Sequence, residues 1–288
     1  FDIDETGHPV SVFFKESKDA NQLVEEFMLL ANRTVAEFIG KVKGGNPKTF
    51  VYRVHDEPDP ERMENLQNFV AKFGYKLKTN GDPAEMAKSM NKMLSEVKGK
   101  KEQELIETIS IRSMQKACYT TENIGHYGLA FKFYTHFTSP IHRYPDLMVH
   151  RLLNRYIGDG RRVNQGKYEE YCEHCSAQEQ LAEQAERSSI KYKQVEYMSD
   201  RMGQVFDAVI SGVTEWGIYA EIIENKCEGM IPIRSLGGDY FEFDEKNYCL
   251  IGQRTRKRYR LGDHVKVKVV RCNLEKKQMD YELVSTEE

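Results

Sequence analysis

The spacing of apolar residues divides the chain into a long helical part and a shorter β part. Between residues 20 and 40 the apolar positions recur every three or four residues, at Leu23, Val24, Phe27, Met28, Ala31, Val35, Phe38 and Ile39. This spacing predicts one amphipathic helix whose apolar face packs against a core. Asp59-Pro60 and Gly74 predict the start and the end of a second helix, because aspartate caps an N-terminus, proline suits the first turn and glycine suits the end.

Two more helices follow in the polar middle of the chain. Asp82-Pro83 and Gly99 bracket one of them in the same way. A long polar helix is predicted from about Tyr168 to Met202, after a loop at residues 158–166 (GDGRRVNQG) that is rich in glycine and polar residues.

In the last third of the chain the period of the apolar pattern changes to two. Residues 203–223, 227–236 and 261–284 alternate apolar and polar positions between glycine and charged turns. This pattern predicts short antiparallel strands that form a five-stranded OB-fold barrel, a fold that binds single-stranded nucleic acid. The fold class is therefore α+β, with a mainly helical part at residues 1–200 and a barrel at 201–288.

Composition narrows the class of protein without identifying it. With 288 residues the chain is long enough for two domains with cores of their own. Its 42 basic and 45 acidic residues leave a net charge of −3, so binding of nucleic acid has to come from local patches. No apolar run approaches the roughly 20 residues of a membrane span, and no signal peptide begins the chain. The opening FDIDETGHPV lacks a methionine and alternates like a strand, which predicts a piece of a longer protein.

The six cysteines indicate no disulfide framework. They are scattered along the chain, and a reducing cytoplasm is their simplest setting. Cys172 and Cys175 have the spacing of a zinc-binding pair, but they lie in a strongly helical stretch without a second pair to complete four ligands. We therefore predict no metal site there.

The most informative segment is 125–152, GHYGLAFKFYTHFTSPIHRYPDLMVHRL. Its aromatic first half predicts a strand, and Ser139-Pro140 predicts a helix that begins with Ser139 as its N-cap and Pro140 in its first position. His142, Arg143 and Asp146 lie at spacings of three and four, so they can share one helix face with His150. A basic cluster beside helix N–H groups suits a phosphate oxygen. The alternative is an amphipathic helix whose charges are only solvated.

The amino-acid sequence of this segment resembles a known family signature. HFTSPIHRYPDLMVHRLL resembles the signature of the RNB family of exoribonucleases. Residues 21–33 (NQLVEEFMLLANR), 51–58 (VYRVHDEP) and 112–130 (RSMQKACYTTENIGHYGLA) resemble further blocks of its ribonuclease R branch, in the same order. The resemblance covers essentially the whole chain.

The resemblance implies a fold and an activity. Residues 1–200 would form the C-terminal portion of an RNB catalytic domain, and residues 201–288 an S1-type RNA-binding barrel. Members of the family degrade single-stranded RNA processively by hydrolysis from its 3′ end, release nucleoside 5′-monophosphates and depend on Mg²⁺. Their magnesium ligands are aspartates that lie upstream of the blocks found here. Asp2 and Asp4 do not match them, so we expect the principal metal ligands to lie outside this chain.

The resemblance also singles out candidate catalytic residues. His142 stands where the family has an arginine that contacts the phosphate at the point of cleavage, and Arg143 follows it. Histidine lacks the fixed charge and the bidentate fork of arginine, so full catalytic strength is in question. Glu186 matches an acid near the terminal nucleotide, while Glu25 and Glu26 match acids near the nucleotide-binding end of the channel. On residue type alone, each of these three glutamates would be a solvated helix-surface residue.

Tyr144 and the barrel supply the remaining candidates for RNA binding. Trp216 and Tyr219 resemble the two surface aromatics of S1 barrels, and residues 228–233 (EGMIPI) resemble its EGLVHI segment, with Pro232 in place of histidine. Residues 251–277 contain ten lysines and arginines against two acids. Aromatic faces stack on bases while cations follow the phosphates. The RNA-binding candidates in the barrel are Trp216, Tyr219, Arg234, Arg256, Arg258, Lys266 and Lys268. The alternative is a solvated hairpin with Trp216 partly in the core.

Two functions stay open at this point. One is the C-terminal part of a ribonuclease R-like exoribonuclease. The other is an RNA-binding module without catalytic activity of its own. Acidic residues upstream of this sequence would favour the enzyme.

Overall fold

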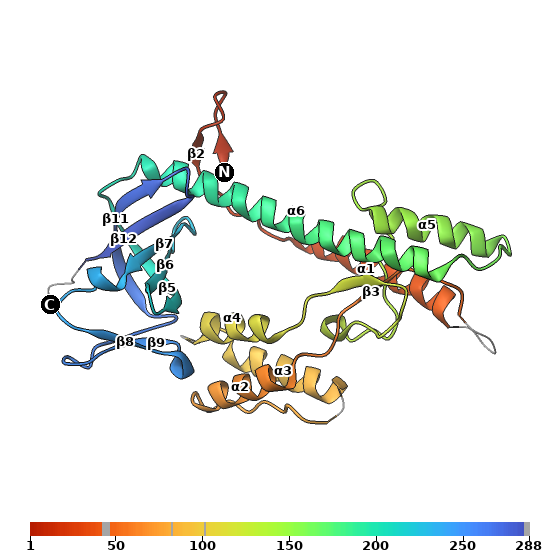
Figure 1. The fold of residues 1–288 in the computed structure, drawn as a ribbon, viewed down its shortest axis with the longest axis horizontal. Coiled ribbons are helices and arrows are strands. Elements are labelled where there is room, and N and C mark those ends of the chain that lie inside the picture. The colour runs from red at the N-terminus through yellow and green to blue at the C-terminus, as the bar shows by residue number, and fades with distance from the viewer. Residues whose placement is uncertain (42–46, 82, 101, 285–288) are drawn as a thin grey trace. The chain divides into compact units, whose positions relative to one another are not determined.

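The computed structural model describes residues 1–41, 47–81, 83–100 and 102–284, which Figure 1 draws as a coloured ribbon. The chain divides into two compact units. The first unit comprises Phe1–Lys15, Val97–Thr108 and Gln184–Glu288. The second comprises Glu16–Glu96 and Ile109–Glu183. Helices and strands both contribute, which confirms the predicted α+β class. No helix in the described part of the chain is long and apolar enough to cross a membrane.

The predicted first helix of the second unit is present as α1, Asp19–Gly40. Its burial differs from the prediction, because the apolar side chains along its first half are exposed and only Asn32, Ala36 and Ile39 are buried. Phe27 and Phe38 are both more than 60% exposed. The prediction of a helix packed through its whole apolar face was therefore wrong, because the elements described in this unit cover only its second half.

Three shorter helices, α2, α3 and α4, span Pro60–Ala71, Pro83–Val97 and Gln103–Ser113. The predicted limits of α2 are confirmed. The Asp59 carboxylate accepts the backbone N–H of Glu61 at 3.0 Å and that of Arg62 at 3.2 Å, and Gly74 adopts a positive φ of 84° beyond the helix end. Asp82, the predicted cap of α3, lies outside the described residues.

The core of the second unit lies where a small sheet meets three helices, one of which is the second half of α1. Strand β3, Tyr52–Val54, pairs antiparallel with β4, Cys118–Thr120. Helix α5, Tyr144–Ile157, and the first half of the long helix α6, Gln165–Ser199, add side chains to the same cluster. The long polar helix predicted near residues 168–202 is therefore confirmed, with a start a few residues earlier.

The segment 125–152 corrects two predictions. Its aromatic half is not a strand: it forms a short 3₁₀ turn, Tyr127–Leu129, and an irregular stretch joined by single bridges at His126. Helix α5 begins at Tyr144, so Ser139 is not its N-cap and Pro140 is not its first residue. The N-cap is Arg143, and Pro145 occupies the first turn instead.

The first unit contains the predicted five-stranded barrel. Its strands are β5 (Val205–Thr214), β6 (Gly217–Ile222), β7 (Glu228–Pro232), β11 (His264–Asn273) and β12 (Gln278–Leu283), closed in the order β11-β12-β7-β6-β5. Buried isoleucines and Tyr281 fill its interior. A Cβ at Gly229 would lie 2.6 Å from the Tyr281 ring, so this glycine makes room for the largest buried side chain.

Two small sheets accompany the barrel. An antiparallel insert between β7 and β11 consists of β8 (Phe241–Asp244), β9 (Cys249–Gly252) and β10 (Arg258–Arg260). An N-terminal hairpin consists of β1 (Asp2–Ile3) and β2 (Pro9–Ser11).

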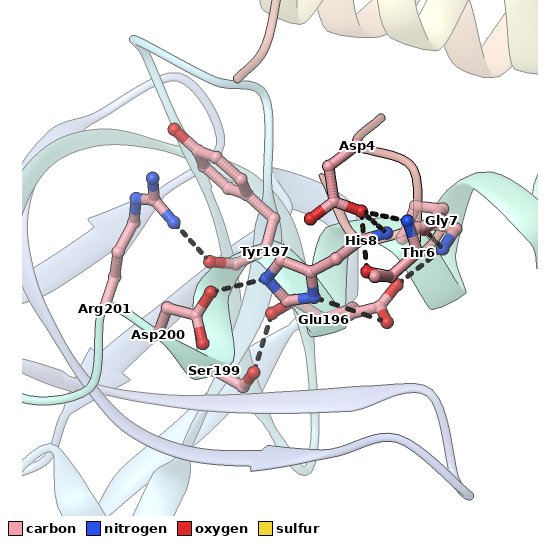
Figure 2. A network of polar contacts seen from close by, with 10 residues as sticks. Asp4, Thr6, Gly7, His8, Glu196, Tyr197, Ser199, Asp200 and Arg201 are labelled. Carbon is pink, nitrogen blue, oxygen red and sulfur yellow. Dashed lines mark hydrogen bonds and ion pairs between the residues drawn. The ribbon is translucent and has the colours of Figure 1, made fainter. Parts of the chain in front are cut away.

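Polar contacts join the N-terminal hairpin to the C-terminal end of α6 (Figure 2). The Nε2 atom of His8 lies 2.7 Å from Oδ2 of Asp200, and its Nδ1 lies 3.6 Å from Oε1 of Glu196. Within the hairpin, the Asp4 carboxylate accepts the backbone N–H groups of Thr6 and His8. The Asp200 hydrogen bond, together with nearby carboxylates, raises the pKa of His8.

Candidate nucleic-acid interface

A buried carboxylate organises the loop that leads into α5. Asp146 is fully buried, and its Oδ1 accepts the backbone N–H of Ser139 at 2.8 Å. The Arg143 guanidinium donates to both oxygens, from Nε to Oδ2 at 2.9 Å and from Nη2 to Oδ1 at 2.8 Å. Burial alone would lower the pKa of Arg143, but these bonds and the carboxylate charge raise it. Asp146 thus fixes the turn from inside the first turn of α5, and Ser139 contributes a backbone donor rather than a cap.

This arrangement presents His142 to solvent. The Oγ atom of Ser139 and the Nδ1 atom of His142 are 3.1 Å apart, and the His142 side chain is exposed. When the hydroxyl donates to Nδ1, the Nε2 atom carries the ring proton and can donate to an oxygen of a bound phosphate. Two of the Arg143 nitrogens are engaged by Asp146, so Arg143 has less of its donor fork left for a ligand.

Asn32 and His150 hold the same loop from two sides. Phe137 donates its backbone N–H to Oδ1 of Asn32 at 2.9 Å, and its carbonyl oxygen lies 2.9 Å from Nε2 of His150. The rings of Phe137 and His150 stack with centroids 4.0 Å apart. His150 therefore supports the loop. Because α5 begins at Tyr144, His142 precedes the helix and the predicted helix face shared by His142 and His150 does not form.

Two half-buried histidines near the loop, His126 and His136, were not singled out from the sequence. Nδ1 of His136 lies 2.8 Å from the Tyr119 hydroxyl, and burial together with the charges of Arg143 and Arg53 lowers the pKa of His136 to about 3. Burial, His55 and Arg53 lower the pKa of His126 to about 4. Both imidazoles are therefore neutral near pH 7 and act as hydrogen-bonding and packing groups. The histidines of GHYG and YTHF were visible in the sequence, but no spacing distinguished their burial.

The predicted glutamates are all exposed on helices. Glu25 and Glu26 are exposed on α1 in the second unit. Glu186 is exposed on the part of α6 that belongs to the first unit. Tyr144 is half-exposed at the first residue of α5, directly after Arg143.

On the barrel, the two predicted aromatics lie close together in sequence and register. Trp216 is 68% exposed in the turn between β5 and β6. Tyr219 is half-buried on β6, opposite Gly212, where a Cβ would lie 3.3 Å from the Tyr219 ring. Gly212 thus leaves space for the ring to lie on the barrel surface. The prediction that Trp216 belongs to the surface rather than the core is confirmed.

The predicted cations are all exposed, on several elements of the first unit. Lys266 and Lys268 alternate on β11 with the buried Val267, and Lys266 lies 3.3 Å from Oδ1 of Asp207. Arg234 follows β7 in a short 3₁₀ turn. Arg256 occupies the turn before β10 with a φ of 58°, and Arg258 begins β10.

A cavity brings two of these cations together. It has a volume of about 920 Å³ and lies between the β10 end of the insert and the barrel strands β5 and β11. Its lining includes Lys257, Arg258 and Lys266 against two acids, Asp207 and Asp263. Among the described residues, neither Lys257 nor Arg258 is in an ion pair, so their charges remain available to an anion.

The described residues do not offer a metal site. No group of three or more histidines, cysteines, aspartates or glutamates lies close enough together to hold a metal ion within the described ranges. Asp4 is engaged in the hairpin turn, and Asp2 accepts the Ser11 hydroxyl. Cys172 and Cys175 are free thiols, and burial raises the pKa of both. The described residues therefore do not fit the metal ion on which the family depends.

Comparison with known families decides the relationship. The family model of the RNB domain matches residues 1–159, more than half of the chain. The chain belongs to the RNB family. The model of the S1 RNA binding domain matches residues 199–283, the part that forms the barrel. These two matches confirm the resemblance drawn from the sequence. RNB ribonucleases are metal-dependent.

Known relatives of this RNB chain are similar along nearly all of its length. Ribonuclease R of Aquifex aeolicus is 39% identical over 98% of this chain and 40% of that protein. The solved apo structure of Mycoplasma genitalium RNase R superimposes with a TM-score of 0.89 at 27% identity, covering 98% of this chain and 44% of that one. Yeast Ssd1, described as a pseudonuclease, superimposes with a TM-score of 0.65 at 26% identity over 80% of this chain and 29% of its own. The chain thus spans about two fifths of the length of the curated relatives it matches.

Proposed function

We propose that this chain supplies the RNA-holding part of a ribonuclease R-like enzyme, which hydrolyses RNA processively from its 3′ end and releases nucleoside 5′-monophosphates. The observation that carries the proposal is the loop at residues 135–143, which Asp146 fixes so that His142 faces solvent. The loop lies directly before α5 and within the residues that the RNB family model matches. In this proposal His142 donates a hydrogen bond to the phosphate at the point of cleavage, and Arg143 adds charge beside it.

RNA binding by the barrel is the second part of the proposal. Single-stranded RNA is held by Trp216 and Tyr219, on which bases stack, and by the exposed cations of β10 and β11. The solved structure of Mycoplasma genitalium RNase R in complex with ribose-methylated single-stranded RNA superimposes on this chain with a TM-score of 0.88. This likeness supports single-stranded RNA as the ligand class. We propose a cytoplasmic location for the protein, because its six cysteines are free thiols, as is usual in a reducing compartment.

A catalytically silent RNA-binding module is the second candidate. It is favoured by the lack of a metal-binding group among the described residues and by the likeness to a pseudonuclease. A 3′-labelled oligonucleotide in magnesium separates the two. We expect no release of monophosphate from residues 1–288 alone, because we expect the metal-binding aspartates of the family to lie outside this chain. Steady release by this chain would contradict that expectation and would require a metal site within it.

The barrel surface is tested by fluorescence polarisation with a labelled single-stranded RNA. Trp216→Ala and Tyr219→Ala should each weaken binding by roughly 5- to 150-fold, the equivalent of about 1–3 kcal/mol for one lost stacking contact. Tyr192→Ala, which removes an exposed tyrosine of α6, serves as the matched control. Unchanged affinity in the first two variants at moderate salt would exclude this surface.

Salt dependence tests the contribution of single cations. Each phosphate contact contributes about 0.7 to the slope of log affinity against log salt for a single strand. Arg258→Gln should therefore reduce that slope by about 0.7. His142→Arg should increase it by the same amount, because arginine adds a fixed charge where histidine stands. If the slope is unchanged in one of these variants, the substituted residue does not contact a phosphate of the bound RNA.

A further inference from the structure

Helix α5 and the start of α6 enclose a pocket in the second unit. Its α5 side lies within the segment 136–153 that resembles the RNB signature, whereas its α6 side lies outside the blocks that resemble the family. On α5, Tyr144, Met148 and Arg151 are spaced by four and three residues, so they lie along one face. Asn164, directly before α6, and Lys167, Tyr168 and Tyr171 in its first turns have the corresponding spacing. Together with Val163 these seven side chains line a cavity of about 310 Å³.

The walls of this pocket are held in place by the core. Met148 is 2% exposed and forms part of the hydrophobic cluster. Tyr168 and Tyr171 are half-buried and pack against the same cluster, with ring centroids 5.8 Å apart and planes at 69°. Tyr144 is 51% exposed at the opposite helix. Because the two α6 tyrosines are anchored, the pocket presents aromatic surface that does not have to be ordered when a ligand binds.

The polar groups around the pocket favour an anion. Arg151 and Lys167 are exposed, and neither is in an ion pair within the part of the chain that the structure describes. The lining residues include no carboxylate. The Lys167 ammonium lies 5.8 Å from the centroid of the Tyr171 ring, so charge and aromatic surface are next to each other. Asn164 is already used, because its Oδ1 accepts the Lys167 backbone N–H at 3.0 Å.

We propose that this pocket binds one nucleotide unit, with the base against the tyrosine rings and the phosphate between Arg151 and Lys167. The proposal deepens the function proposed above, since it rests on RNA or its products as the ligand class. A volume of about 310 Å³ is at the lower end of the range of about 300–1,000 Å³ that is typical of small-ligand pockets, which suits a single nucleotide. Aromatic faces bind any base, and the cations add a phosphate that a nucleoside lacks. An acidic peptide would use the cations and leave the tyrosines without a role.

Equilibrium dialysis of the whole chain with adenosine 5′-monophosphate, adenosine and inorganic phosphate tests the pocket. We expect the monophosphate to bind more tightly than either of the others. Arg151→Ala and Lys167→Ala should each lower affinity for the monophosphate at least fivefold and leave that for adenosine unchanged. Tyr168→Ala should lower affinity for both ligands by about fivefold or more. Tyr192→Ala on the same helix is the matched control.

A loss of affinity in the two charge variants would not reflect unfolding, because Arg151 and Lys167 are exposed and their replacement leaves every core side chain in place. Monophosphate that binds no better than inorganic phosphate would overturn the proposal. Unchanged affinity in both charge variants would overturn it as well.

Competition with a single-stranded oligonucleotide then distinguishes the two sources of the nucleotide. An oligonucleotide that displaces the monophosphate identifies a unit of the RNA chain as the ligand. A monophosphate that stays bound identifies the free mononucleotide. Trp216→Ala should weaken oligonucleotide binding at the barrel and leave monophosphate binding at the pocket unchanged. Failure of the barrel surface and failure of this pocket therefore give different results.

Discussion

The buried carboxylate of Asp146 should be the most sensitive single position of the second unit. Asp146→Ala removes the acceptor of three hydrogen bonds, one from the Ser139 backbone and two from the Arg143 guanidinium. A hydrogen bond to a charged group contributes about 1.5–3 kcal/mol. Arg143 is 32% exposed, so water replaces part of its two bonds and we discount them by about half. The expected loss is about 3–5 kcal/mol, the range for breaking a buried ion pair by removing one partner.

Urea unfolding measures this loss. With a slope of about 2 kcal/mol per molar urea, the midpoint should fall by roughly 2 M. Circular dichroism at 222 nm follows the helices, while fluorescence of Trp216, the one tryptophan of the sequence, follows the barrel separately. Glu173→Ala, which removes an exposed carboxylate of α6, is the control and should be nearly neutral.

A double-mutant cycle isolates the pair itself. Arg143→Ala alone leaves Asp146 buried without its counter-charge, so it should also destabilise, and the two changes together should cost less than their sum. The reasoning would be refuted by a loss below about 1 kcal/mol in Asp146→Ala, or by strictly additive effects. Either result would mean that water or another donor satisfies this carboxylate.

Two further changes test contacts in the first unit. His8→Gln should lower the melting temperature at about pH 6 and have little effect at about pH 9. The Asp200 hydrogen bond raises the pKa of His8. The stability that protonated His8 contributes is therefore complete below about pH 6.5 and is lost as the pH rises through the raised pKa. Equal losses at both pH values would contradict this linkage. Gly229→Ala should cost about 1–3 kcal/mol in urea unfolding followed by Trp216 fluorescence, because its Cβ would lie 2.6 Å from the buried Tyr281 ring. An unchanged midpoint would show that the ring shifts freely.

The parts of the fold that could be predicted are those in which the signal is local. Asp59 and Gly74 mark the limits of α2 because a cap and a positive φ are properties of a few consecutive residues. The alternation of Lys266, Val267 and Lys268 on β11 likewise follows from the two-residue period of a strand. These features need no knowledge of what packs against them.

The errors arose where distant contacts decide. The periodicity of α1 gave the helix but not its exposure, because periodicity states which residues share a face and not whether anything covers that face. Ser139-Pro140 has the composition of a helix start, yet the helix begins four residues later. The deciding residue is Asp146, whose side chain reaches back to the loop and whose burial depends on the rest of the core.

The same geometry explains why a substitution of His142 should not destabilise the fold. The hydrogen bonds that fix the loop are made by the Ser139 backbone, the Arg143 guanidinium and Asp146, with Asn32 holding Phe137. Within the part of the chain that the structure describes, the exposed His142 side chain contributes only its contact with the Ser139 hydroxyl. A change of its charge therefore alters what the loop offers to a phosphate and leaves the scaffold intact. For this reason the salt dependence of His142→Arg reports on phosphate binding, whereas a change at Arg143 would report on folding as well.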